Sequence, residues 1–192
     1  MWILIICYEN PKAVAVLRIL KYPDPLLKKA ALPVEHISGD TIRLVQDMVE
    51  TMYAAPGVGL AAPQVGMLQR IVVLDVDYEN PGKNLIKLIN PEIRHKEGEV
   101  VWEEGCLSVI DFTAEVKRAA RVEVVGLNEK EQNISVEGEG LLAVALQHEI
   151  DHLDGKLFID RISRLKRELY SRRLKKMLRS GKPHPESPRL MI

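Results

Sequence analysis

Apolar and polar positions along the chain predict three helices separated by strands. Apolar side chains recur at helical spacing over residues 38–54, where Ser38 or Asp40 can cap the helix. A second helix is expected over residues 139–153, and a third, strongly basic one over residues 160–179. These three segments account for the helical periodicity in the sequence.

Short runs of aliphatic and β-branched residues predict the strands. The expected strands lie at residues 14–20, 70–77, 85–89, 92–101, 114–118 and 121–127. Residues 128–133 suit a hairpin turn, whereas residues 57–66 are small and Gly-rich and show no periodic pattern. Because helices and mostly antiparallel strands are mixed without strand–helix–strand alternation, the sequence predicts the α+β class.

A chain of 192 residues fits one domain. We expect an N-terminal extension (1–13), a catalytic domain (14–163), and a basic C-terminal helix with a Pro-rich, disordered tail (164–192). No apolar run approaches the roughly 20 residues of a membrane-spanning helix, and no signal peptide is recognisable. Two scattered cysteines form no disulfide framework, which favours a reducing, cytoplasmic location.

The formal net charge of zero hides an asymmetry. Residues 161–182 contain ten Lys or Arg and a single acid, which gives this segment a charge of +9. The remainder of the chain carries −9. A neutral total is therefore compatible with a polyanionic partner at the C-terminal end.

The most informative motif is QHEIDH, residues 147–152, on the second predicted helix. His148 and His152 lie four residues apart, so both can reach one metal ion from the same helix face. Glu149 stands beside them, where it can act on water as a general base. Surface histidines spaced by chance are the alternative.

A catalytic metal of this kind needs a third protein ligand. Downstream, Glu168 and His184 lie in the basic helix and the Pro-rich tail, which makes them weak candidates. Upstream, Cys106 lies in EEGCLS, whose acids, glycine and serine are unlike the surroundings of a buried structural cysteine. Cys106 is therefore the favoured third ligand.

The segment GVGLAAPQ, residues 57–64, is a third candidate element. Its glycines allow close approach of another chain, and Gln64 offers an amide that can donate a hydrogen bond to an oxyanion. The segment lacks the G-x-G-x-x-G pattern and the P-loop lysine, so it gives no support to a nucleotide site.

In these three segments, in this order, the sequence resembles the peptide deformylase family. That family has a GxGxAAxQ loop, an EGCxS segment and a histidine-bearing helix, which read here GVGLAAPQ, EGCLS and QHEIDH. The resemblance extends from about Val16 to about Ser163. It implies antiparallel sheets surrounding a central helix that carries the HExxH motif, with the basic helix added at the C-terminus.

The resemblance also implies an activity, the removal of the formyl group from the N-terminal formyl-methionine of new proteins with release of formate. Cys106, His148 and His152 would hold the metal, and Glu149 would be the catalytic acid and base. Gln64 and the backbone N–H of Leu107 would form the oxyanion hole. The residues expected to bind the substrate are Val58, Gly59, Leu141, Val144 and Ala145.

The cofactor and the partners follow from the same resemblance. Family members imply Fe²⁺, one ion per chain, although a Cys–His–His set also suits Zn²⁺, Ni²⁺ or Co²⁺. The helix at 160–179 is expected to dock on ribosomal RNA, and no DNA or membrane partner is expected. The sequence departs from the family pattern at Ile110-Asp111, where proline is frequent, and at Thr113.

Two other functions remain open from the sequence. A zinc endopeptidase would share the HExxH helix but not the need for Cys106 or for a formyl group. An inactive peptide-binding homologue would share the fold. The intact set of Gln64, Cys106, Glu149 and both histidines favours the hydrolase over the latter.

Overall fold

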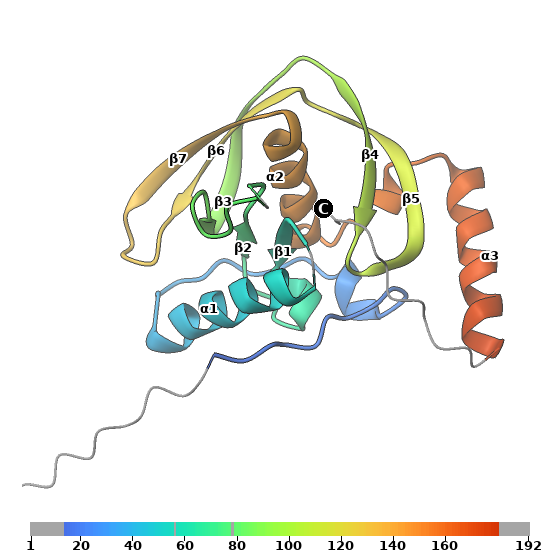
Figure 1. Ribbon diagram of the computed structural model, residues 1–192, viewed down its shortest axis with the longest axis horizontal. Helices are drawn as coiled ribbons and strands as arrows, with labels where there is room; N and C mark the ends of the chain where they lie inside the picture. Colours follow the sequence, from blue (N-terminus) through green and yellow to red (C-terminus); the bar gives the residue numbers. More distant parts are fainter. Residues whose placement is uncertain (1–13, 56, 78, 181–192) are drawn as a thin grey trace, which may run out of the picture.

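The computed structural model describes residues 14–180 except 56 and 78, and its strands surround a central helix (Figure 1). The helices are α1 (Gly39–Ala54), α2 (Gly140–Leu153) and α3 (Arg164–Ser180), with short 3-10 helices η1 (Pro25–Lys28), η2 (Ala62–Val65) and η3 (Phe158–Asp160). The strands are β1 (Gly59–Ala61), β2 (Ile71–Leu74), β3 (Ile86–Glu97), β4 (Val100–Cys106), β5 (Val109–Arg118), β6 (Arg121–Leu127) and β7 (Asn133–Glu139). The predicted α+β class, with a central motif helix and a basic C-terminal helix, is confirmed.

The strands form two antiparallel groups around α2. One is a five-stranded sheet in the order β1-β2-β3-β6-β7, and the other is the β4-β5 hairpin. In Figure 1, α2 lies between the sheet and this hairpin, and it contacts β1, β2, β6 and β7. Residues 143–153 are all buried, so the polar side chains of the QHEIDH motif are held in the interior of the protein.

Helix α1 covers the opposite side of the sheet from α2. Ser38 caps it, since its side chain accepts a hydrogen bond from the backbone N–H of Thr41 at 3.2 Å. Its apolar face, with Val45, Met48 and Met52, packs in a core cluster with residues of β1 and β2. The helix predicted over 38–54 is thus confirmed, and it packs against β1 and β2.

Several predicted strands differ from those observed. Residues 14–20 form no strand, because their backbone lies across α1 and bonds to its side chains: the N–H of Leu17 donates to Thr51 Oγ1 at 2.8 Å. The strands expected at 85–89 and 92–101 are largely one strand, β3, which ends before Gly98 (φ +65°). Strand β7 was not predicted, although it pairs with β6 along its whole length.

The basic helix begins at Arg164 rather than at residue 160, because residues 158–160 form the 3-10 helix η3. Tyr170 and Leu174 of α3 are buried in a core cluster with residues of β5, whereas Leu165 and Leu169 are exposed. The expected N-terminal extension (1–13) and the tail from residue 181 lie outside the described residues. No helix within the described part of the chain is long and apolar enough to cross a membrane.

Candidate metal centre

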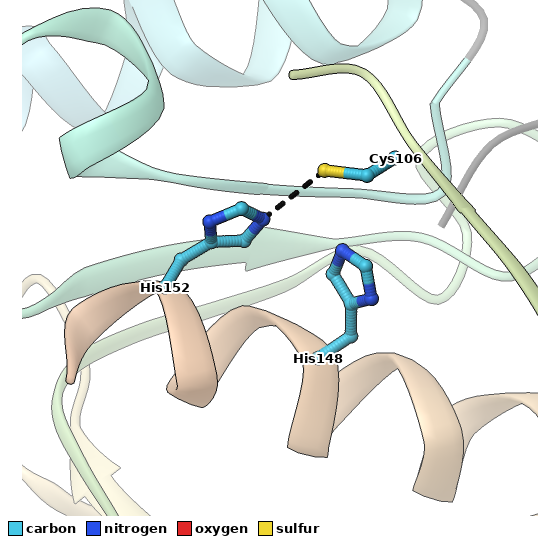
Figure 2. Close-up of side chains that lie close together, drawn as sticks. All are labelled: Cys106, His148 and His152. Carbon is cyan, nitrogen blue, oxygen red and sulfur yellow. Dashed lines mark hydrogen bonds between the residues drawn. The ribbon is translucent and has the colours of Figure 1, made fainter. Parts of the chain in front are cut away.

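Three side chains from two elements meet in the interior beside α2. Cys106 is the last residue of β4, and His148 and His152 lie one turn apart on α2. Their candidate ligand atoms all lie within 4.8 Å of one another, and all three residues are buried. Figure 2 shows Cys106 reaching toward the two imidazoles, with Sγ 3.2 Å from His152 Nε2. The structure thus brings the three predicted ligands together.

The donor atoms fit a bound transition metal. His148 Nδ1 is hydrogen-bonded to Glu104 Oε2 at 2.8 Å, whereas its Nε2 is buried without a partner among the described residues. Ligands placed about 2.0–2.3 Å from one tetrahedral ion lie roughly 3.3–3.8 Å from each other, and the 3.2 Å between Cys106 Sγ and His152 Nε2 is close to this range. A thiolate and two imidazoles suit zinc, iron, nickel or cobalt.

The charges around the two histidines favour a cation at this place. Burial alone would lower the pKa of His148, but Cys106 and Glu104 outweigh it and raise the pKa well above its usual value. The pKa of His152 is lowered well below its usual value by burial and by the neighbouring His148. The anionic groups that favour a proton on one imidazole would likewise attract a metal ion.

Glu149 lies beside the ligands on α2, and its side chain is buried. Both carboxylate oxygens are buried without a partner in the described part of the chain. Burial is the main cause that raises the pKa of Glu149, to about 7. A buried carboxyl group in this state can accept and return a proton near neutral pH. Gly59 approaches this side chain closely, because a Cβ built on Gly59 would lie 2.5 Å from Glu149 Oε1.

Gln64 is held with its amide nitrogen toward the centre. Its Oε1 accepts from the backbone N–H of Ala61 at 2.8 Å, which orients the amide. Its Nε2 donates to Ser108 Oγ at 3.2 Å and lies 3.6 Å from Cys106 Sγ. Leu107 follows Cys106 directly and is half-buried. Of the two predicted oxyanion donors, Gln64 Nε2 thus lies near the thiol, and the Leu107 N–H belongs to the residue that follows it.

A buried charge network that the sequence did not reveal supports the centre. Arg118 donates to both carboxylate oxygens of Glu104, at 2.6 and 2.9 Å, and to Asp151 at 2.6 Å. Asp151 also binds Arg161. Glu104 in turn holds His148, so the network fixes the orientation of this imidazole, as outer-shell carboxylates do in metal sites.

Gln147 explains another polar position of the motif. Its side chain accepts from the backbone N–H of Ala119 at 3.0 Å and donates to the carbonyl of the same residue at 3.0 Å. Because Ala119 joins β5 to β6, this pair of bonds attaches α2 to the turn between them. Gln147 thus helps to fix the position of α2 relative to β5 and β6.

The predicted substrate-binding residues also come together. Val58, Val144 and Ala145 are buried in one apolar cluster, and Leu141 packs against it half-buried. Trp102 of β4 packs on the same cluster and was not predicted, because a single aromatic residue in an alternating strand gives no signal of its own. Gly59 begins β1, the edge strand of the five-stranded sheet.

Replacing Arg118 with methionine is expected to lower the free energy of unfolding by about 3–5 kcal/mol at pH 8. The buried carboxylates of Glu104 and Asp151 would both lose this cationic partner, and Glu104 would be left with its hydrogen bond to His148. Burial alone would raise the pKa of Glu104, but Arg118 and His148 hold it below its usual value. In the natural chain this contribution is present above the unfolded pKa and is lost as pH falls through the lower folded value. Without Arg118 the folded pKa rises, so the deficit should shrink as Glu104 becomes protonated.

Urea unfolding of the metal-free chain at pH 5 and pH 8 measures this difference. Lys117→Met is the matched control, because Lys117 is the adjacent residue and forms an exposed ion pair with Glu99. It should change the unfolding free energy little. An equal deficit for Arg118→Met at both pH values would contradict the charge argument and point to lost packing.

Comparisons with known proteins match most of the chain. The family model described as "Polypeptide deformylase" matches residues 16–168. A peptide deformylase of Thermodesulfovibrio yellowstonii is 55% identical over 161 residues, covering 84% of this chain and 98% of the relative. A crystal structure of a peptide deformylase from Legionella pneumophila has a TM-score of 0.81 at 46% identity, covering 88% of this chain and all of that one. One from Synechococcus elongatus, in complex with actinonin, has a TM-score of 0.79 at 34% identity, covering 87% of this chain and 92% of the other.

Proposed function

The chain belongs to the polypeptide deformylase family, and on that premise we propose that it removes the formyl group from the N-terminal formyl-methionine of new proteins. It is accordingly a metal-dependent enzyme that hydrolyses an amide and releases formate. The observation that carries the proposal for this chain is the buried Glu149, whose carboxylate has no partner among the described residues, together with the converging atoms of Cys106, His148 and His152.

Cys106, His148 and His152 are proposed to hold one Fe²⁺ ion, which Zn²⁺, Ni²⁺ or Co²⁺ can replace. The donor set and its spacing support this assignment. When bound, the ion supplies a Lewis acid that polarises the formyl oxygen and lowers the pKa of water. Glu104 orients His148 through the hydrogen bond between its carboxylate and Nδ1 of the imidazole.

The remaining chemistry is assigned to the chain's own groups. Glu149 takes a proton from the attacking water and then delivers it to the departing amine nitrogen of the substrate. As the formyl carbon becomes tetrahedral, negative charge develops on the formyl oxygen. Gln64 Nε2 and the backbone N–H of Leu107 donate hydrogen bonds to it, and losing one such donor typically costs roughly 10²–10³ in rate.

The substrate is proposed to lie along β1, because this edge strand has no partner on its outer side among the described residues. An extended peptide can add to such an edge by backbone hydrogen bonds that start at Val58 and Gly59. The methionine side chain would enter the apolar cluster of Val58, Leu141, Val144 and Ala145.

Gly59→Ala is expected to lower kcat about 10²-fold, because the added methyl group would lie 2.5 Å from Glu149 Oε1 and 2.9 Å from its Cδ. A displacement of about 1 Å in a catalytic group is enough for a loss of this size. Formate release with the metal content measured in parallel tests it. Gly39→Ala is the control, since nothing lies within 4 Å of a Cβ there. Unchanged kcat for Gly59→Ala would remove Glu149 from the proposed role.

The function is tested with anaerobically purified, Fe²⁺-loaded protein and a formyl-Met peptide. Formate should be released, the matching acetyl-Met peptide should be untouched, and a chelator should stop the reaction. Cleavage of internal bonds regardless of the formyl group would instead identify an endopeptidase. Equal activity after aerobic purification would favour Zn²⁺ or Ni²⁺ over Fe²⁺, since Fe²⁺ and the Cys106 thiolate are open to oxidation.

Because its substrates are nascent chains, we place the enzyme in the cytoplasm and propose that α3 docks on ribosomal RNA. Tyr170 and Leu174 attach the inner face of α3 to the body, and the Tyr170 hydroxyl donates to the carbonyl of Ile110 at 3.2 Å. The outer face presents exposed cations beside Leu165 and Leu169. A face rich in exposed cations suits a polyanionic partner.

Neutralising Arg172, Lys176 and Arg179 together to glutamine is expected to weaken co-sedimentation with ribosomes while leaving hydrolysis of a free formyl peptide unchanged. If each of these cations pairs with one phosphate, removing all three would reduce the slope of log affinity against log salt by up to about 2–3. Substitution is preferable to truncation after Ser163, which would also remove the buried Tyr170 and Leu174.

The control for α3 carries the same change in charge elsewhere on the surface. Lys83, Lys96 and Lys130 are exposed and lie in loops or strands away from α3. Their triple glutamine variant should sediment with ribosomes like the unaltered chain at every salt concentration. Equal losses for both triple variants would assign the binding to net charge and not to α3.

A further inference from the structure

The extended segment from Leu20 to Tyr22 contacts both proposed oxyanion donors. The backbone N–H of Leu20 donates to the carbonyl of Gln64 at 2.7 Å, and that of Tyr22 donates to the carbonyl of Ser108 at 2.7 Å. Between them, Lys21 Nζ donates to the carbonyl of Leu107 at 2.5 Å. The segment thus connects the Gln64 turn to the residues that follow Cys106.

A single peptide group links Lys21 to the sulfur of Cys106. That group joins Leu107 to Ser108: its carbonyl accepts from Lys21, and its N–H, on Ser108, donates to Cys106 Sγ at 3.4 Å. A cation on the carbonyl oxygen polarises the amide and makes its N–H a stronger donor. The positive charge of Lys21 therefore strengthens the hydrogen bond to Cys106 Sγ, although Lys21 does not contact the sulfur itself.

The setting of Lys21 differs from that of a freely solvated surface lysine. Although the residue as a whole is exposed, burial near its ammonium group lowers the pKa of Lys21, and the charge of Cys106 partly offsets this effect. Losing hydration is unfavourable for an ammonium ion, and here a backbone carbonyl replaces part of the lost water.

We propose that Lys21 is a positioning residue for the deformylase reaction, acting through the Leu107–Ser108 peptide. It draws electron density away from the Cys106 thiolate, which leaves a metal ion at this site a stronger Lewis acid. The inference rests on the proposed function, since a stronger Lewis acid would act on the formyl oxygen.

The test compares Lys21→Met, which removes the charge, with Lys21→Arg, which retains it, and with Lys29→Met as a control at an exposed lysine of the same region. Two readouts are independent of turnover. In the Zn²⁺-loaded protein, the amide proton resonance of Ser108 should move upfield in Lys21→Met, because its hydrogen bond to sulfur weakens. In the Co²⁺-loaded protein, the thiolate-to-metal charge-transfer band should move to longer wavelength, because the sulfur becomes more electron-rich.

In the turnover assay, Lys21→Met should lose about tenfold in kcat with full metal content and nearly unchanged KM, the lower end of what outer-shell changes cost. Lys21→Arg should restore the band, the resonance and most of kcat, and Lys29→Met should change none of them. A lower kcat with both spectra unchanged would reduce Lys21 to a structural contact and overturn the proposal. Failure of the unaltered chain to release formate would instead reject the proposed function, and the spectra would still decide the effect of Lys21 on Cys106.

Discussion

Cys106→Ser is expected to abolish tight metal binding. The thiolate is the one ligand candidate that comes from outside α2, and within the described residues no other cysteine, histidine or acid completes a group with His148 and His152. A neutral hydroxyl replaces an anionic sulfur, so affinity should fall by more than the 10–100-fold typical of changes in outer-shell partners. Formate release should fall with metal occupancy.

Metal content after dialysis, and competition with a chelator of known affinity, measure this loss. Ser108→Ala is the matched control, because it removes a buried hydroxyl two residues away and leaves the Ser108 backbone N–H in place to contact Cys106 Sγ. It should bind metal like the natural chain. Full, tight occupancy in Cys106→Ser would mean that a different third ligand exists, and it would restore the endopeptidase as a serious alternative.

The residues of the candidate metal centre could be singled out in the sequence because their signals are local. His148 and His152 share one helix face because they lie four residues apart, and Glu149 stands beside them in the sequence. Cys106 has no partner nearby in sequence, but its polar, Gly-containing flanks are unlike those of a core cysteine. The family resemblance then gave Gln64 and Leu107 their proposed roles, which spacing could not have done.

The supporting groups could not be predicted, because their partners are distant in sequence. Arg118 meets Glu104 across the β4-β5 hairpin and Asp151 from α2, a juxtaposition that only the tertiary fold creates. In the sequence these are ordinary surface charges. Lys21 gave no signal for the same reason, since its partner is a backbone carbonyl 86 residues away.

The errors in the predicted fold have similar causes. Strand β7 is polar at every second position, with Asn133, Ser135 and Glu137 exposed, and it contains Gly138, so its amino acids look like a loop. Pairing with β6 determines its structure instead. Residues 14–20 show the opposite case, because their aliphatic composition favours a strand but no neighbouring strand in the described part of the chain is available to pair with them.

Glu149→Gln is expected to keep the metal and lose roughly 10²–10⁴ in kcat, the usual contribution of a general acid–base group. Glu149 is no member of the ligand group, so the ion should be retained. Glutamine preserves the shape of the side chain next to Gly59 but cannot accept and return a proton. A loss of activity at full metal content therefore separates proton transfer from metal binding.

The pH dependence gives a second, independent signature of Glu149. Burial raises the pKa of this carboxyl to about 7, so in the natural chain kcat/KM should rise with pH through this region as the base loses its proton. The Glu149→Gln variant should lack this rising limb of the pH profile, and its kcat/KM should remain low at every pH. Glu103→Gln, an exposed acid on β4 near the same centre, is the control and should keep both the rate and the limb. If the limb persists in Glu149→Gln, another group titrates there, and the assignment of Glu149 as the base is wrong even if its removal slows the reaction.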